Sequence, residues 1–140
     1  MFYFEEINGY KVLKSDFGVN AGLNHCFTTR NVEISDFYPN NFYLSPQQTH
    51  SDHVEIVDER FEYPDTDGLI IAQKNIPIAL RFADCTPLIF YDIKNEIGAI
   101  SHAGWRGTAQ KIGVKTVQKM EQNFNTRPQD IIAIIGPAIG

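Results

Sequence analysis

The stretch Ile97-Gly-Ala-Ile-Ser-His-Ala-Gly-Trp-Arg-Gly-Thr108 marks the point at which the hydrophobic pattern of this chain changes. Before it, short apolar runs bounded by turn residues are typical of strands. After it, apolar residues recur at helical spacing as far as Phe124, and Thr108 is a good N-cap, so we predict a helix over 108–124. A last apolar run at 131–135 predicts a buried strand. The pattern as a whole predicts the α+β fold class.

Turn residues divide the chain before the helix into several short strands. Asn8-Gly9 is a strong hairpin signal within residues 1–30. The other predicted strands lie at 54–57, 69–71, 76–82, 88–91 and 97–101. We expect one domain over 1–140. Because a domain rarely ends on the turn after its most apolar strand, we expect this one to be truncated at its C-terminal end. We then expect exposed apolar surface or an open pocket near 136–140, and such a patch should favour self-association.

The composition is that of an ordinary globular protein, with 43% hydrophobic residues among 140. Seventeen acidic residues against twelve basic ones, with no Lys/Arg run, argue against nucleic acid or an anionic membrane as partner. Two cysteines are too few for a disulfide-rich secreted scaffold. The N-terminus carries acids where a signal peptide needs basic residues, and we find no run long enough to span a membrane, so we expect a cytoplasmic protein.

Three residues with metal-ligand chemistry fall at the ends of predicted strands: His50, Cys85 and His102. Their wide separation excludes the local ligand pairs of a structural zinc knuckle. Three ligands from separate strand ends leave a fourth tetrahedral position open, which is the catalytic arrangement. His50 shares a strand face with Val54 if that strand extends backwards, whereas His53 points the other way. We therefore predict His50 as the ligand.

The same residue types also support readings without a metal. Cys85 as nucleophile with His102 as its base would make a cysteine-hydrolase dyad. In a purely structural reading, Cys85 is a small buried hydrophobe and His102 caps its strand. Spacing alone leaves these alternatives open.

A candidate anion site lies between the predicted strand and the helix. Glycines flank Trp105-Arg106, so backbone N–H groups at the helix start can point at one spot, and the arginine adds charge. Arg106, Gly107 and Thr108 are the predicted phosphate-binding residues. A tight turn with Trp105 packed in the core is the alternative. Arg30 and Arg81, each near a strand end, could also meet an anionic ligand, although such arginines are more often surface ion-pair residues.

Five motifs in sequence order resemble one family: Gln48-Thr-His50, Asp67-Gly-Leu-Ile, Ala83-Asp-Cys85-Thr-Pro87, Ser101-His-Ala-Gly-Trp-Arg-Gly107-Thr and Gly136-Pro-Ala-Ile-Gly140. The family is known as multicopper polyphenol oxidase (laccase-like), laccase-domain protein, or YfiH-type purine nucleoside phosphorylase, and the resemblance covers roughly residues 22–140. After Thr29-Arg30 this chain departs from the family's usual Gly-Gly-x-Ser and Asn-rich stretch and has Asn31-Val-Glu-Ile-Ser35 instead.

The resemblance implies both a fold and a site. The implied fold is a mixed β-sheet core flanked by helices, with some likeness to bacterial toxin cysteine deamidases. The implied site is a zinc centre made by His50, Cys85 and His102 beside a purine nucleoside pocket, with Arg30 and Gln48 as substrate contacts. Family activities are phosphorolysis of adenosine, inosine and methylthioadenosine, adenosine deamination and, for some members, copper-dependent phenol oxidation.

The amino-acid inventory favours the nucleoside activity over the oxidase. Four histidines cannot supply both copper centres of an ordinary multicopper oxidase, and Met120, in the middle of the helix, is poorly placed as an axial ligand. Phosphorolysis is therefore the leading expectation, and phenol oxidation with copper in place of zinc is the runner-up. A non-catalytic nucleoside-binding module is a further alternative. Asp84 is an acid near the site, but as the strand neighbour of Cys85 it is expected to face the other way.

Overall fold

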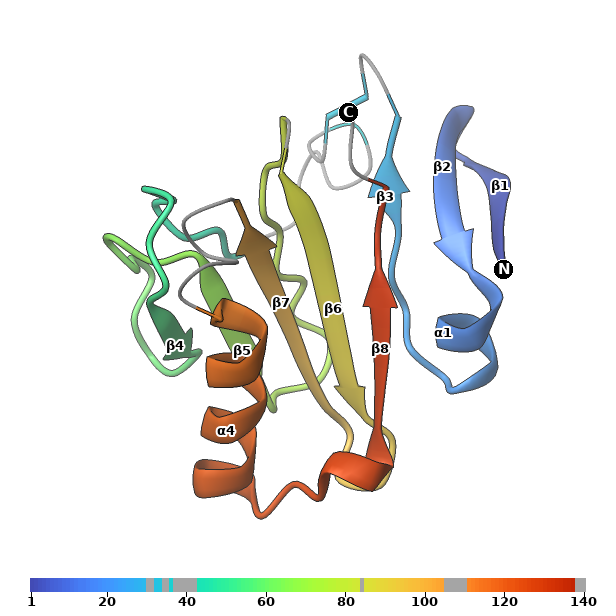
Figure 1. The fold of residues 1–140 in the computed structure, drawn as a ribbon. Coiled ribbons are helices and arrows are strands. Elements are labelled where there is room, and N and C mark those ends of the chain that lie inside the picture. The colour runs from blue at the N-terminus through green and yellow to red at the C-terminus, as the bar shows by residue number, and fades with distance from the viewer. Residues whose placement is uncertain (30–31, 34–35, 37–42, 84, 105–110, 138–140) are drawn as a thin grey trace.

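The computed structural model describes residues 1–29, 32–33, 36, 43–83, 85–104 and 111–137. Within these residues the strands form two sheets (Figure 1). The smaller sheet has the order β1-β2-β3, and the larger has the order β4-β5-β7-β6-β8. In the larger sheet β4 and β5 are parallel and the other neighbours are antiparallel. The predicted α+β class with a mixed sheet is therefore confirmed.

The bounds of the elements are close to those expected from the hydrophobic pattern. The strands are β1 (Phe2–Ile7), β2 (Tyr10–Ser15), β3 (Phe27–Thr28), β4 (Val54–Ile56), β5 (Gly68–Ile71), β6 (Thr86–Asp92), β7 (Ile97–Ala103) and β8 (Ile131–Ile135). The helices are α1 (Asp16–Asn20), α4 (Ile112–Phe124) and the 3₁₀ turn η1 (Pro128–Asp130). Asn8 and Gly9 both have positive φ, 52° and 83°, as a type I′ hairpin turn between β1 and β2 requires.

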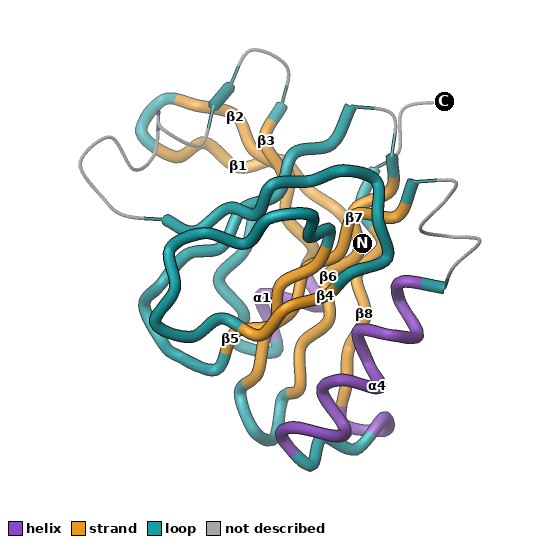
Figure 2. The backbone as a smooth tube through the Cα atoms, turned by 90° about the vertical axis from the view of Figure 1, so that its left-hand side faces the viewer, coloured by secondary structure: helices purple, strands orange, loops and turns teal. Residues whose placement is uncertain are grey.

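The larger sheet is covered on both faces (Figure 2). Helix α4 buries Ile112 and Met120 against one face, in a cluster with Ile70, Phe90 and other residues of the strands. Loop segments cover the opposite face, where the buried or partly buried members are Leu44, Val57, Tyr63, Leu69, Ile71, Ile76, Ile78, Leu80 and Ile100. Because β5 is buried on both faces, its four residues read as a continuous apolar run rather than an alternating one.

Three elements differ from the sequence prediction. Residues 76–82 are not a strand of either sheet but make an isolated bridge between Leu44 and Ile78, where Pro77 has no N–H to give to a ladder. Residues 16–20 form the short helix α1, whereas the pattern over 1–30 predicted only short strands and turns. Helix α4 begins at Ile112 with Lys111 at its N-cap, later than predicted, and Thr108 lies outside the described residues.

The strand β8 leaves apolar surface uncovered at its end. Ile135 is 64% exposed, and Ala133 is exposed as well. This agrees with the expected apolar surface near the last residues, of which 138–140 lie outside the description. Self-association through it stays a prediction. Among the described helices, none has the length and apolarity needed to cross a bilayer.

A histidine fastens the start of α1 to the loop that follows it. The backbone N–H of Ser15 donates to His25 Nε2 at 2.9 Å, and the Nδ1–H side of the ring faces the Leu23 carbonyl at 3.2 Å. Both nitrogens are therefore satisfied only in the neutral ring. Burial, aided by the charge of Lys14 and opposed by the Leu23 carbonyl, lowers the pKa of His25 below its usual value.

We expect the two hydrogen bonds of the His25 ring to make folding stability depend on pH. An unfolded histidine titrates near pH 6.5. Because the folded pKa lies lower, the unfolded chain binds more protons as the pH falls below about 6.5, so the free energy of unfolding should decrease there and level off below the folded pKa. Urea unfolding at pH 7.5 and 5.5 should show a larger loss for the wild type than for His25→Gln. Equal losses in the wild type and in His25→Gln would contradict the idea.

Candidate metal centre

Three side chains converge at one end of the larger sheet. One ligand atom from each of His50, Cys85 and His102 lies within 4.8 Å of the other two. The rings of His50 and His102 meet edge to face with centroids 5.0 Å apart. The structure thus brings together the three residues that the sequence singled out, although their binding of a metal stays a prediction.

The antiparallel pairing of β6 and β7 brings two of the ligands together. Pro87 of β6 is opposite His102 of β7, so the start of β6 lies beside the end of β7. Cys85 immediately precedes β6. The sequence predicted that Cys85 would follow a strand over 76–82, and that segment is not a strand of either sheet. The start of β6 and the end of β7 therefore place Cys85 and His102 close to each other.

His50 is placed by a loop rather than by a strand. Strand β4 starts at Val54, and His50 has a φ of 62°, so the strand-phase argument for choosing it was wrong although the residue is the same. The left-handed backbone is maintained by Asp67, whose carboxylate accepts N–H groups from Thr49 at 3.0 Å, His50 at 3.2 Å and Ser51 at 2.9 Å. A positive φ at a non-glycine residue needs such support.

The same carboxylate orients the second histidine. Asp67 is fully buried, and its Oδ2 accepts a hydrogen bond from His102 Nδ1 at 2.7 Å. Burial raises the pKa of Asp67, but hydrogen bonds from Thr49, His102 and Ser51 outweigh it and hold the pKa below the usual value. An ionised Asp67 keeps the hydrogen of His102 on Nδ1, which leaves Nε2 as an acceptor for a metal.

From the sequence, Asp67 was identified only as the first residue of the motif Asp67-Gly-Leu-Ile and not as a residue that orients the ligands. The signal that could have found its role is register. In β5, Gly68 is opposite Ser101, so Asp67 continues the ladder beside His102. That pairing cannot be known before the strands are matched.

A glycine gives the ligands room. A Cβ built on the buried Gly104 would lie 3.2 Å from Cys85 Sγ and 3.4 Å from the ring of His50. The ring of Phe82 also packs near the cluster, with its centroid 5.3 Å from that of the His102 ring. His50 is exposed, Cys85 half-buried and His102 buried, so the cluster opens to solvent at its His50 side.

The donor set suits zinc. Two imidazoles and one thiolate are common zinc ligands, and three protein ligands leave one position for water or substrate. In a tetrahedral set with bonds of about 2.0–2.3 Å the ligand atoms stand roughly 3–4 Å apart. In the structure the three ligand atoms lie up to 4.8 Å apart, which is slightly wider. Modest side-chain rotations would close these residues around an ion. Copper accepts the same donors.

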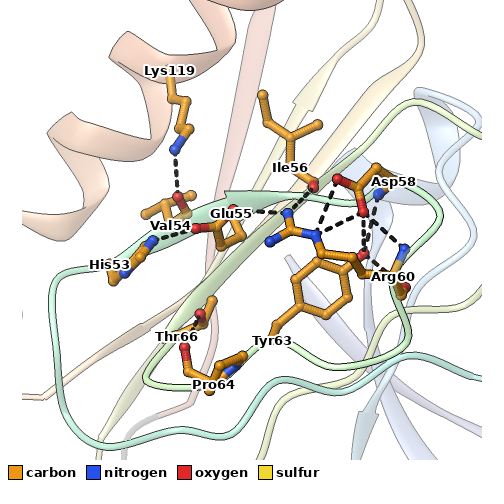
Figure 3. Close-up of polar contacts among 10 residues, drawn as sticks. All are labelled: His53, Val54, Glu55, Ile56, Asp58, Arg60, Tyr63, Pro64, Thr66 and Lys119. Carbon is orange, nitrogen blue, oxygen red and sulfur yellow. Dashed lines mark hydrogen bonds and ion pairs between the residues drawn. The ribbon is translucent and has the colours of Figure 1, made fainter.

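The other two histidines have different partners. The ring of His53 contacts Glu55, which also receives Arg60 in an ion-pair network along the edge strand β4 (Figure 3). The ring of His25 is hydrogen-bonded to the backbone of Ser15 and Leu23. Both thiols, Cys26 and Cys85, are free.

Gln48 joins the His50 loop to the segment that leads to Cys85. Its side-chain NH₂ donates to the Arg81 carbonyl, and its side-chain oxygen accepts from the Arg81 N–H, both at 2.7 Å. This gives Gln48 a positioning role in the present structure, while its predicted contact with substrate stays untested. The remaining predicted site residues, Arg30, Asp84, Arg106, Gly107 and Thr108, lie outside the described residues.

Comparisons with known proteins agree on one family. Residues 24–140 match the model of the family described as "Multi-copper polyphenol oxidoreductase laccase". The chain is 40% identical to purine nucleoside phosphorylase YlmD of Bacillus subtilis, over 97% of this chain and 51% of that protein. It is 38% identical to adenosine deaminase RL5 of an unknown prokaryotic organism, over 69% of this chain and 40% of that protein.

A solved structure shows the same likeness. The crystal structure of the hypothetical protein YfiH from Bacillus licheniformis aligns with a TM-score of 0.71 and 35% identity, over 76% of this chain and 45% of that one. The chain spans about half the length of YlmD, and less of RL5.

Proposed function

The chain belongs to the multi-copper polyphenol oxidoreductase laccase family, and on that premise we propose that it takes part in phosphorolysis of purine nucleosides at a zinc centre formed by His50, Cys85 and His102. The observation that carries this proposal is the convergence of the three ligands with an open side. The names of relatives add support, since YlmD is called a purine nucleoside phosphorylase and RL5 an adenosine deaminase.

The chain's own residues account for how such a site would be held ready. Phosphorolysis joins a phosphate oxygen to C1′ of the ribose and breaks the bond from C1′ to the purine, which leaves with a proton. A zinc ion bound by the three ligands would supply Lewis-acid polarisation of an oxygen ligand. Asp67 fixes the tautomer of His102 and the loop of His50, and Gln48 ties that loop to the segment before Cys85. On this proposal the His50 loop and the His102 ring are oriented before substrate arrives.

Phosphate dependence tests the proposal. The zinc-loaded protein should release adenine from adenosine only when inorganic phosphate is present. Arg106→Ala should lower this rate by about one to two decades, because it removes a charge-assisted contact to phosphate. Hydrolytic deamination of adenosine needs no phosphate and should fall less. Release of base at equal rates with and without phosphate would contradict phosphorolysis.

The family description also supports a second candidate, copper-dependent oxidation of phenols. The site lacks one part of a blue-copper centre, because Met120 is fully buried in the α4 cluster and Met1 is bound through its amino group to Asp16. The rate of phenol oxidation should increase with the copper content of the protein and should not depend on the phosphate concentration. If the copper-loaded protein oxidises phenols and the zinc-loaded protein never releases free base from adenosine, the oxidase is favoured.

A further inference from the structure

A hollow of about 630 Å³ lies between the smaller sheet and the segment 78–83, and Cys85 forms part of its wall. That volume is within the usual range for small-molecule sites, roughly 300–1,000 Å³. The hollow therefore joins the candidate metal centre to a space large enough for a nucleoside.

The N-terminal hairpin supplies one wall of this hollow. Phe4 of β1 is opposite Leu13 of β2, and Leu13 is opposite Phe27 of β3, so the three side chains form a row across one face of the smaller sheet. All three line the hollow. The wall facing them includes the apolar and aromatic side chains of Tyr43, Ile78, Leu80, Phe82 and Pro87.

Much of this hairpin lies outside the family match. The family model covers residues 24–140, whereas Phe4 and Leu13 precede it. Phe4 is 60% exposed, with Lys11 Nζ 4.5 Å from the centre of its ring. The cation holds the aromatic side chain in place at the rim of the hollow.

We propose that the row Phe4, Leu13 and Phe27 receives the flat heteroaromatic base of the nucleoside, with the sugar directed toward Cys85. This inference rests on the proposed function and adds the hairpin to the substrate site. Apolar and aromatic walls stabilise a purine ring by stacking and by removing its faces from water. Ribose hydroxyls and phosphate need donors and charge, which a metal ion bound at the centre that includes Cys85 would provide.

Equilibrium binding of adenine and of ribose 1-phosphate to the zinc-loaded protein tests the inference. Phe4→Ala should weaken adenine binding roughly three- to tenfold, while ribose 1-phosphate binding and zinc content remain unchanged. Phe4→Trp should restore most of the adenine affinity. The matched control is Phe17→Ala in α1, since Phe17 is 69% exposed and does not line the hollow; it should bind both ligands as the wild type does.

The outcomes separate the two proposals. If Phe4→Ala binds adenine as tightly as Phe17→Ala does, and the wild type still carries out phosphorolysis, the hairpin has no part in recognition and the proposed function stands. An equal loss of adenine and ribose 1-phosphate binding would indicate a general disturbance and overturn the inference. If the wild type neither binds adenine nor releases it from adenosine, both proposals fail.

Discussion

Replacing Cys85 by alanine is expected to remove zinc from the protein and, with it, the release of adenine from adenosine. Cys85 supplies the sulfur atom of the cluster with His50 and His102. A thiolate holds the ion and neutralises part of its charge, so two imidazoles alone make a much weaker site. Changing even an outer residue of a metal site costs 10–100-fold in affinity, so loss of this ligand should cost more than about 100-fold.

The measurement is zinc affinity by competition with a chelating indicator, with stoichiometry from elemental analysis. Cys26→Ala is the matched control, because Cys26 is also a free, half-buried thiol but is not part of the cluster. The control should bind one zinc per chain with wild-type affinity. If Cys85→Ala bound zinc as well as the control did, the assignment of the centre would be wrong.

Cys85 also separates the metal site from a cysteine hydrolase. The positions of Cys85, His102 and Asp67 resemble a nucleophile, its base and an orienting acid. Bound zinc should protect Cys85 from iodoacetamide, and a chelator should restore labelling. Equal labelling of Cys85 with and without zinc would favour the cysteine-hydrolase interpretation.

The sequence predicted the elements whose pattern is local. The apolar run of β8 and the Asn8-Gly9 turn appear as expected, because each depends on residues adjacent in the chain. The segment 76–82 was misjudged because an apolar run that packs over a sheet looks like a strand within one.

The sequence singled out the three residues that converge in the structure, but not the residues that position them. Histidine and cysteine are few and chemically distinct, so motif and position indicated them. Asp67 and Gly104 act through close contacts between strands that are distant in sequence, and nothing in the local pattern distinguishes them from turn residues. The strand-phase argument for choosing His50 over His53 was wrong, since backbone hydrogen bonds to Asp67 place His50, and its role as a ligand stays a prediction.

Asp67 is therefore the outer residue with the largest expected effect. Its Oδ1 accepts the N–H groups of Thr49 and Ser51 and the Ser51 hydroxyl, and its Oδ2 accepts from the His50 N–H and from His102 Nδ1. Five donors and no acceptor face this buried side chain. Only a carboxylate satisfies them, because an amide must turn its own hydrogens toward some of these donors.

Asp67→Asn should consequently reverse the tautomer of His102. If the amide oxygen stays with Thr49 and Ser51, the NH₂ group faces Nδ1, which must then accept, and the ring hydrogen moves to Nε2, the atom needed for the metal. Zinc affinity should fall about 10–100-fold, and ¹⁵N spectra of the imidazole should show the proton shift from Nδ1 to Nε2. Asp65→Asn should change neither, because Asp65 is exposed and its carboxylate accepts from the Thr49 hydroxyl, which is not a donor to Asp67. An unchanged His102 tautomer in a folded Asp67→Asn protein would show that Asp67 does not control the ligand.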